Sequence, residues 1–251
     1  MQHLFAGLTP QQQAEKLLGR ALTFPNPEYQ CQKCKDVGWI ETEPDKRMKK
    51  CECLVRKEVE RAIAKSGISE AFKQCTFDNF KAWDARVATA RGIAEAYSIE
   101  FPNIEAGRQN SFALLGEVGS GKTMLGVCVL NSLTKRGVSV LYASYRDIMS
   151  ELKGNVLDDN EYHRALDRYV KPRVLFIDDL YKGYTQNDPK YVYDVINARY
   201  LAKKPIIVTS ELNADQLLDI DAAVGSRIIE MSRDYIYWLR GDGLNYRLRG
   251  L

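Results

Sequence analysis

One loop near the middle of the chain restricts the possible folds more than any other feature. It matches the pattern G-x-x-x-x-G-K-[S/T] in full, as Gly116, Glu117, Val118, Gly119, Ser120, Gly121, Lys122 and Thr123. An apolar strand pattern at 111–115 precedes it and a helical pattern at 124–136 follows. Glycines let successive backbone N–H groups point at phosphate oxygens, and the helix N-terminus adds partial positive charge. We therefore expect an ATP site here; the alternative is a glycine-rich turn that matches by chance.

Specific side chains have expected roles in this site. Lys122 should reach the β- and γ-phosphates, and the Thr123 hydroxyl should ligate Mg²⁺. A second motif follows the apolar strand pattern at 174–177, where Asp178 and Asp179 emerge at the carboxyl end. We expect Asp178 to hold the hydrated magnesium ion. Asp179 should orient or activate the attacking water, unless it only caps the following loop.

The pattern along the chain predicts an α/β fold. Alternating strands and helices indicate a mostly parallel five-stranded sheet covered on both faces. Strands are predicted at 111–115, 138–143, 174–177, 205–209 and 235–239, and helices at 85–101, 124–136, 146–153 and 191–201. Upstream, helical patterns occur at 10–22 and 54–65. We expect two domains: residues 1–66, a helical segment with a small cysteine module, and residues 67–251, the ATPase domain.

Composition excludes several classes of protein. A net charge of +3 is too small to predict a nucleic-acid binder from charge alone. No apolar run reaches the roughly 20 residues needed to span a bilayer. The first ten residues lack the basic start and apolar stretch of a signal peptide. We therefore expect a cytoplasmic protein with reduced thiols and no membrane partner.

Four cysteines form two closely spaced pairs, Cys31 with Cys34 and Cys51 with Cys53. Thiolates at C-x-x-C and C-x-C spacing can converge on one tetrahedral ion, and four of them suit Zn²⁺. A segment this small cannot bury a core, so metal binding would supply its fold. Two disulfides or an iron–sulfur cluster are the alternatives. The remaining cysteines, at 75 and 128, are expected to be ordinary buried residues.

Further motifs accompany the ATP loop in a defined order: Phe77-Asp78-Asn79-Phe80, Ile177-Asp178-Asp179-Leu180, Asn197-Ala198-Arg199-Tyr200, Thr209-Ser210-Glu211-Leu212, Gly225-Ser226-Arg227-Ile228 and Asn245-Tyr246-Arg247-Leu248. This ordered set resembles the DnaI/DnaC-type replicative helicase loaders, which are AAA+ ATPases of bacteria and their phages. The resemblance covers about residues 29–251. It implies an AAA+ P-loop fold without a helical lid domain, because only a dozen or so residues follow the last predicted strand.

The resemblance also implies roles for arginines and for the residues after the fourth strand. Arg227 is similar to the arginine finger that reaches a neighbouring subunit's ATP site; a helix-surface ion pair is the alternative. Arg199 is a weaker candidate for a second inter-subunit arginine or for a structural one. Related loaders commonly place Asn as the γ-phosphate sensor where this chain has Glu211. A carboxylate would repel phosphate, so sensing is expected to fall to Thr209 or Ser210.

The resemblance implies that the chain docks on a hexameric replicative helicase through residues 1 to about 65, assembles with other copies, and grips single-stranded DNA. The best DNA candidates are loop residues 181–187, with Lys190 and Tyr191 following and with Arg146 and Lys153 as secondary candidates. An ordinary polar loop is the alternative. The basic run 46–50 is either a contact to DNA or helicase, or a solvated loop.

Three functions remain open from the sequence. The first is an ATP-dependent helicase loader with slow hydrolysis activated by oligomerisation, helicase or single-stranded DNA, using ATP, Mg²⁺ and Zn²⁺. The second is a transposition-helper ATPase, which the cysteine module disfavours. The third is a nucleotide-gated adaptor with little hydrolysis, favoured by Asp179, by Glu211 and by the missing lid.

Overall fold

The structure is a computed structural model that describes residues 29–44, 46–65 and 74–249. The helix predicted at 10–22 lies outside these ranges. The chain divides into two compact units between Lys49 and Lys50, whereas the sequence suggested a boundary between residues 66 and 67. Helix α2 (Glu52–Lys65) therefore belongs to the larger unit.

The smaller unit contains a tight turn followed by a two-stranded sheet of β1 (Trp39–Thr42) and β2 (Arg47–Lys50), whose last residue is the first of the larger unit. Lys35 and Asp36 adopt left-handed backbone conformations, with φ of 50° and 65°. The Asp36 carboxylate accepts hydrogen bonds from the backbone N–H groups of Gln30 and Cys31 at 3.1 and 2.9 Å. These bonds close the turn that carries the first cysteine pair.

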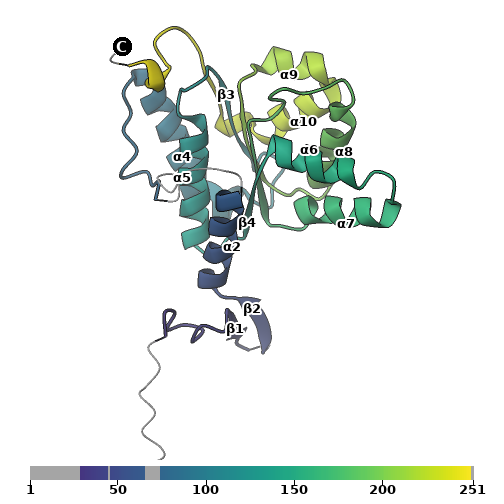
Figure 1. The fold of residues 1–251 in the computed structure, drawn as a ribbon. Helices are drawn as coiled ribbons and strands as arrows, with labels where there is room; N and C mark the ends of the chain where they lie inside the picture. Colours follow the sequence, from purple (N-terminus) through teal and green to yellow (C-terminus); the bar gives the residue numbers. More distant parts are fainter. Residues whose placement is uncertain (1–28, 45, 66–73, 250–251) are drawn as a thin grey trace, which may run out of the picture. The chain divides into compact units, whose positions relative to one another are not determined.

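The larger unit is built on a five-stranded sheet in the order β4-β5-β6-β3-β7, and every pairing in it is parallel (Figure 1). Its strands are β3 (Phe112–Gly116), β4 (Val140–Ser144), β5 (Val174–Asp178), β6 (Ile206–Ser210) and β7 (Ile236–Leu239). All five lie within three residues of the predicted strands. The prediction of an α/β fold with a parallel five-stranded sheet is confirmed.

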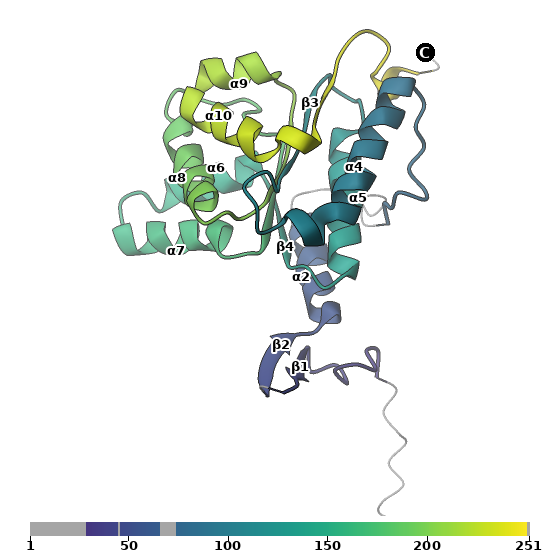
Figure 2. The same cartoon turned by 180° about the vertical axis from the view of Figure 1, so that it is seen from behind.

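Helices cover both faces of this sheet (Figures 1 and 2). One face carries α4 (Ala85–Ile104) and α5 (Lys122–Lys135), with α2 beside β4 and α5. The other carries α6 (Tyr145–Gly154), α7 (Asp159–Val170), α8 (Asp188–Leu201), α9 (Ala214–Ile220) and α10 (Ala222–Met231). Because strand side chains alternate between faces, Phe112 and Leu114 pack into one core and Ala113 and Leu115 into the other. The near-continuous apolar strands are typical of a sheet buried on both sides.

Helices α7, α9 and α10 were not predicted. Helix α7 is largely polar and buries only Ala165 and Tyr169, but its few apolar residues recur on one face at helical spacing. A start signal for α9 was present in the sequence: Asn213 and Gln216 form a capping box, each side chain accepting from the other's backbone N–H. The Asp221 side chain likewise caps α10.

Arg199 is fully buried on α8 and holds the ends of several elements together. Its guanidinium donates to five backbone carbonyls, those of Tyr169, Val170, Pro172, Arg173 and Pro205. Burial lowers the pKa of Arg199 to about 9, which leaves it protonated at neutral pH. Of the two roles considered for this arginine, the structural one agrees with its position, since a side chain enclosed by its own subunit cannot contact another.

Candidate nucleotide-binding site and cysteine cluster

The phosphate-binding loop joins β3 to α5 and depends on glycine at three positions. Gly116, Gly119 and Gly121 have φ of 109°, 71° and 87°, a region that residues with a Cβ atom rarely adopt. A Cβ atom at Gly116 would lie 2.1 Å from the Leu239 carbonyl oxygen. The loop therefore takes its shape from close backbone approach as well as from its turns.

Lys122 lies at the start of α5 with its ammonium turned back into the loop. Its Nζ atom donates to the carbonyl oxygens of Gly116 and Glu117 at 2.8 and 2.6 Å. Burial lowers the pKa of Lys122 to about 8, against the opposing effect of nearby carboxylates led by Glu211. These carbonyl contacts hold the ammonium within the loop that the motif assigns to phosphate.

Asp178 ends β5 as a buried carboxylate surrounded by hydroxyl groups. Oδ1 accepts hydrogen bonds from Thr123, at 2.9 Å, and from Thr209, while Oδ2 accepts from Tyr142 at 2.9 Å. Burial raises the pKa of Asp178 despite these hydrogen bonds. The contact with Thr123 joins the two predicted magnesium ligands, and a carboxylate beside a hydroxyl is a donor set that suits Mg²⁺.

Asp179 follows in a left-handed conformation, with φ of 56°. Its backbone N–H donates to the Thr209 hydroxyl at 3.0 Å. Its Oδ2 atom lies 2.9 Å from Nζ of Lys182, and the same ammonium lies 2.7 Å from Oε1 of Glu211. Lys182 therefore pairs with both Asp179, the predicted water-orienting carboxylate, and Glu211, which stands where a γ-phosphate sensor was expected.

These residues face a cavity of about 420 Å³, within the usual size range of small-molecule sites. One part is lined by residues 118–124 with Asp179, Lys182 and Glu211, and another by aromatic side chains. The Trp83 ring lies 4.7 Å from that of Tyr246 and 6.2 Å from that of Phe80, centroid to centroid. Among the described residues, the buried indole nitrogen of Trp83 finds no hydrogen-bond partner. The rings of Trp83 and Phe80 lie against the loop at Gly121, where an added Cβ atom would meet them at 3.0 and 3.4 Å. Loop amides and aromatic side chains in one cavity are a lining that suits a nucleotide.

The segment after β7 closes over the loop. The backbone N–H of Tyr246 donates to the Gly119 carbonyl at 3.0 Å, and Arg249 donates to the Trp83 carbonyl at 2.8 Å. Tyr246 and Arg247 both line the cavity. Trp83, Tyr246 and Arg247 were not predicted to belong to the nucleotide site, although Tyr246 and Arg247 lie within the motif Asn245-Tyr246-Arg247-Leu248. Between β7 and Arg249, the described residues form only the 3₁₀ turn Tyr246–Leu248.

Two predicted site residues lie elsewhere in the larger unit. Ser210 is buried, donates to the Leu180 carbonyl at 2.8 Å and is not among the described residues that line the cavity. Arg227, on α10, donates to the Ala223 carbonyl at 2.7 Å. Its guanidinium lies over the rings of Tyr193 and Tyr200, at 5.3 and 5.2 Å from their centroids. The structure does not place Arg227 among the residues of its own chain's cavity.

The candidate DNA loop divides into inward-facing and outward-facing residues. Tyr181 is buried, and Lys182 lines the nucleotide cavity. Lys153 pairs with the buried carboxylate of Asp188 at 2.5 Å. Tyr184, Lys190 and Arg146 are exposed, and a Cβ atom at Gly183 would lie 3.5 Å from Arg146. These three side chains are therefore better placed to meet a strand of DNA than Tyr181, Lys182 or Lys153.

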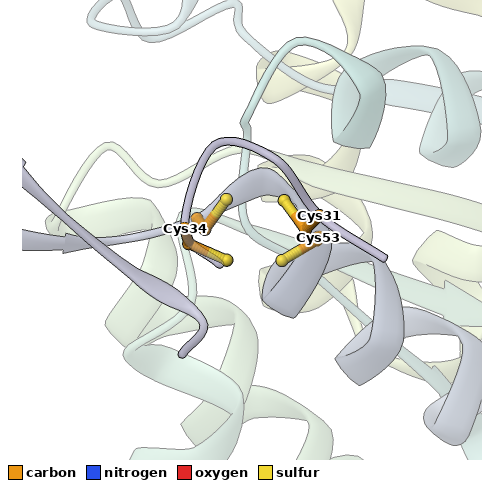
Figure 3. Close-up of side chains that lie close together, drawn as sticks. Cys31, Cys34 and Cys53 are labelled. Carbon is orange, nitrogen blue, oxygen red and sulfur yellow. The ribbon is translucent and has the colours of Figure 1, made fainter. Parts of the chain in front are cut away.

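The four clustered cysteines meet as their spacing predicts. Their Sγ atoms all lie within 4.8 Å of one another, and Figure 3 shows the sulfur atoms of Cys31, Cys34 and Cys53 directed toward one another. Four thiolates around a tetrahedral zinc ion, with Zn–S bonds of about 2.3 Å, would be separated by about 3.8 Å. The backbone N–H of Gly38 also donates to Sγ of Cys34 at 3.3 Å. The group is therefore a candidate metal site.

Comparison with known proteins assigns the chain to a family. A family model described as IstB-like ATP binding protein matches residues 47–230. The chain belongs to the IstB-like ATP-binding family. The uncharacterized protein YqaM of Bacillus subtilis is 43% identical over 81% of this chain and 68% of its own length. The phage-like element PBSX protein XkdC of the same organism is 34% identical over 89% of this chain and 88% of its own.

Helicase loaders are among the similar proteins. The replicative helicase loader DnaC of Escherichia coli is 26% identical over 70% of this chain and 69% of its own length. A crystal structure of the DnaC helicase loader covers 68% of this chain and 100% of its own, with a TM-score of 0.56 and 17% identity. The structure of DnaI covers 69% and 92%, with a TM-score of 0.54 and 24% identity. The predicted resemblance to DnaI/DnaC-type proteins is confirmed, and the structural likeness supports the fold.

No helix within the described part of the chain combines the length and the apolar character that crossing a membrane requires.

Proposed function

We propose that this protein is an ATP-dependent loader that binds a hexameric replicative DNA helicase and helps place it on single-stranded DNA. The observation that carries the proposal is that a P-loop site and a four-cysteine cluster occur in one chain of the IstB-like family. Similarity to a protein named replicative helicase loader supports it. The setting we infer is the cytoplasm of a bacterium or of a phage-infected cell.

The residues of the cavity would divide the chemistry of ATP hydrolysis between them. Lys122 and the N–H groups of the loop would hold the phosphates, and the aromatic wall around Trp83 would hold the base. Thr123 and Asp178 would ligate Mg²⁺, which supplies charge stabilisation at the phosphates when bound. Asp179 would orient the attacking water and accept its proton. The Lys182 ion pair competes for this carboxylate, so we expect slow hydrolysis by the isolated chain.

A second copy of the chain would complete the site. Arg227 is held on α10 by the Ala223 carbonyl and two tyrosine rings, outside its own chain's cavity. We propose that it acts as an arginine finger toward the ATP of a neighbouring subunit, where a guanidinium stabilises transition-state charge. Assembly on the helicase would then activate hydrolysis.

The cysteine cluster would bind zinc through Cys31, Cys34, Cys51 and Cys53. All four donors are sulfur, which favours Zn²⁺ over Mg²⁺ or Ca²⁺. We propose that the region carrying this module docks on the helicase, while exposed residues of the loop after β5 contact DNA.

Co-purification with a candidate hexameric helicase, with and without ATP, tests the loader proposal. We expect a stable complex and faster delivery of the helicase to single-stranded DNA. Lys122→Ala should keep the complex, because docking is assigned to the region of the cysteine module, and should lose the faster delivery. If the protein binds no helicase and does not change its loading, the proposal fails. Recruitment of a transposase in its place would support the transposition-helper alternative.

Phosphate release separates an ATPase from a nucleotide-gated adaptor. We expect hydrolysis above the Lys122→Ala background when helicase and single-stranded DNA are both present. Equal rates in the wild-type protein and in Lys122→Ala would support the adaptor.

A further inference from the structure

We propose that Lys182 contacts the terminal phosphate of bound ATP and that Glu211 positions it for that contact. The inference rests on the ATP site described above and names the γ-phosphate sensor within it. The Lys182 ammonium lies 2.9 Å from Asp179 and 2.7 Å from Glu211, and all three residues line the nucleotide cavity with Lys122 and Thr123.

The strand order brings these groups together. Asp179 and Lys182 follow β5, and Glu211 follows β6, its parallel neighbour in the sheet. Parallel strands end at the same edge, so both connections reach the side of the sheet that carries the phosphate-binding loop. The Lys182 N–H donates to the Asp179 carbonyl at 3.0 Å, and the left-handed residues Asp179 and Tyr181 turn the chain tightly. This turn directs the Lys182 side chain back toward the cavity.

The positive charge of Lys182 explains how Glu211 can lie at the nucleotide cavity. Asp179 and Glu211 would otherwise present two carboxylates to a polyanionic ligand, and repulsion at short range would weaken its binding. Lys182 offsets this charge and brings a donor that suits phosphate oxygen. A lysine held by Glu211 can therefore donate to a phosphate oxygen at a place where the carboxylate alone would repel it.

A purely structural role accounts poorly for the same contacts. The Lys182 and Glu211 side chains are 44% and 31% exposed, and ion pairs this open contribute little to the free energy of unfolding. A DNA contact is also disfavoured, because two carboxylates of the same chain already hold the ammonium toward the nucleotide cavity.

Calorimetric titration of the isolated chain with Mg-ATP and with Mg-ADP tests the inference. We expect Lys182→Gln to weaken ATP binding by about tenfold and to leave ADP binding within about twofold, because only ATP carries the γ-phosphate. Lys135→Gln, which removes an exposed lysine in the last turn of α5 outside the cavity, is the matched control and should bind both nucleotides as the wild type does.

The double variant Lys182→Gln, Glu211→Gln tests the positioning role. Removing the unpaired carboxylate should recover part of the lost ATP affinity, so the two substitutions should be non-additive. The inference is overturned if Lys182→Gln changes ATP and ADP binding equally, or not at all, or if the double variant binds ATP no more tightly than Lys182→Gln. Failure of the loader proposal would appear separately, as absence of helicase binding by a protein that still binds ATP.

Discussion

At the scale of single residues, the nucleotide site depends on ionisable groups whose protonation the fold has shifted. Lys122 is buried among carbonyl oxygens, and Asp178 is buried among hydroxyls. Burial lowers the pKa of Lys122 to about 8 and raises that of Asp178. In both residues burial disfavours the charged form. Bound phosphate would favour the charged form of Lys122, and a bound metal ion would favour that of Asp178.

The Lys122 pKa predicts a dependence of ATP binding on pH. In the empty site Lys122 loses its proton as pH rises through about 8, whereas bound phosphate favours the protonated form. ATP binding should therefore take up a proton above that pH, and the affinity should fall by up to about tenfold per pH unit. Calorimetry in buffers of different ionisation enthalpy measures this uptake. Lys122→Arg, which stays charged, should remove it; an uptake that persists in Lys122→Arg would contradict this assignment.

At the scale of elements, Arg199 connects the end of α7 and the start of β6 through backbone carbonyls. Arg199→Met should lower the free energy of unfolding by about 3–5 kcal/mol, because it leaves buried acceptors without donors. Arg199→Lys should recover only part of the lost free energy of unfolding, since a compact ammonium cannot donate to all five carbonyls. Urea unfolding measures both. Arg164→Met, at an exposed arginine of α7, is the control and should change little; equal stability of the Arg199 and Arg164 variants would refute the structural role.

The cysteine cluster consists of Cys31 and Cys34, in the turn of the smaller unit, and of Cys51 and Cys53, at the start of α2. We predict about one Zn²⁺ per chain, lost in a Cys31→Ser, Cys34→Ser variant because two of four thiolate ligands are gone. Metal analysis of purified protein gives the content directly. Cys75→Ala, at a buried cysteine of the larger unit's core, should keep its zinc. Unchanged metal content in the double variant would rule out this site.

At the scale of the whole molecule, Arg227 is not among the described residues that line the nucleotide cavity. We therefore expect it to act on the ATP of a neighbouring copy of the chain. Arg227→Ala should leave ATP affinity of the isolated chain unchanged, while hydrolysis in the assembled state falls by roughly 10³-fold. Mixing Arg227→Ala with Lys122→Ala should restore part of the activity, since one subunit keeps its ATP site and the other its arginine. Steady-state phosphate release in the presence of helicase measures both effects. A mixture as inactive as its components would argue against action between subunits.

Local patterns determined much of this protein without any tertiary information. Three features were predictable in this way: the P-loop, the carboxylate Asp178 at the end of an apolar strand, and the two cysteine pairs. In each of them the functional residues lie within a few positions of one another, so local strand, turn or helix geometry sets their arrangement. The five strands were predictable because each is a short apolar run; β3, β5 and β6 are buried throughout, whereas the edge strands β4 and β7 are partly exposed. Helix α7 was missed although the sequence carries its signal: Tyr162, Ala165, Leu166 and Tyr169 recur at helical spacing, and Asp158 is a typical N-cap.

Only the tertiary structure decided which distant side chains meet. Lys182 was predicted in a DNA-contact loop and Glu211 at the position of an absent sensor, whereas the packing of β5 beside β6 brings the two side chains together as an ion pair. Trp83 and Tyr246, more than 160 positions apart, form one aromatic wall. Sequence spacing describes neighbours along the chain, while such contacts depend on strand order and on how helices and loops fold back over the sheet.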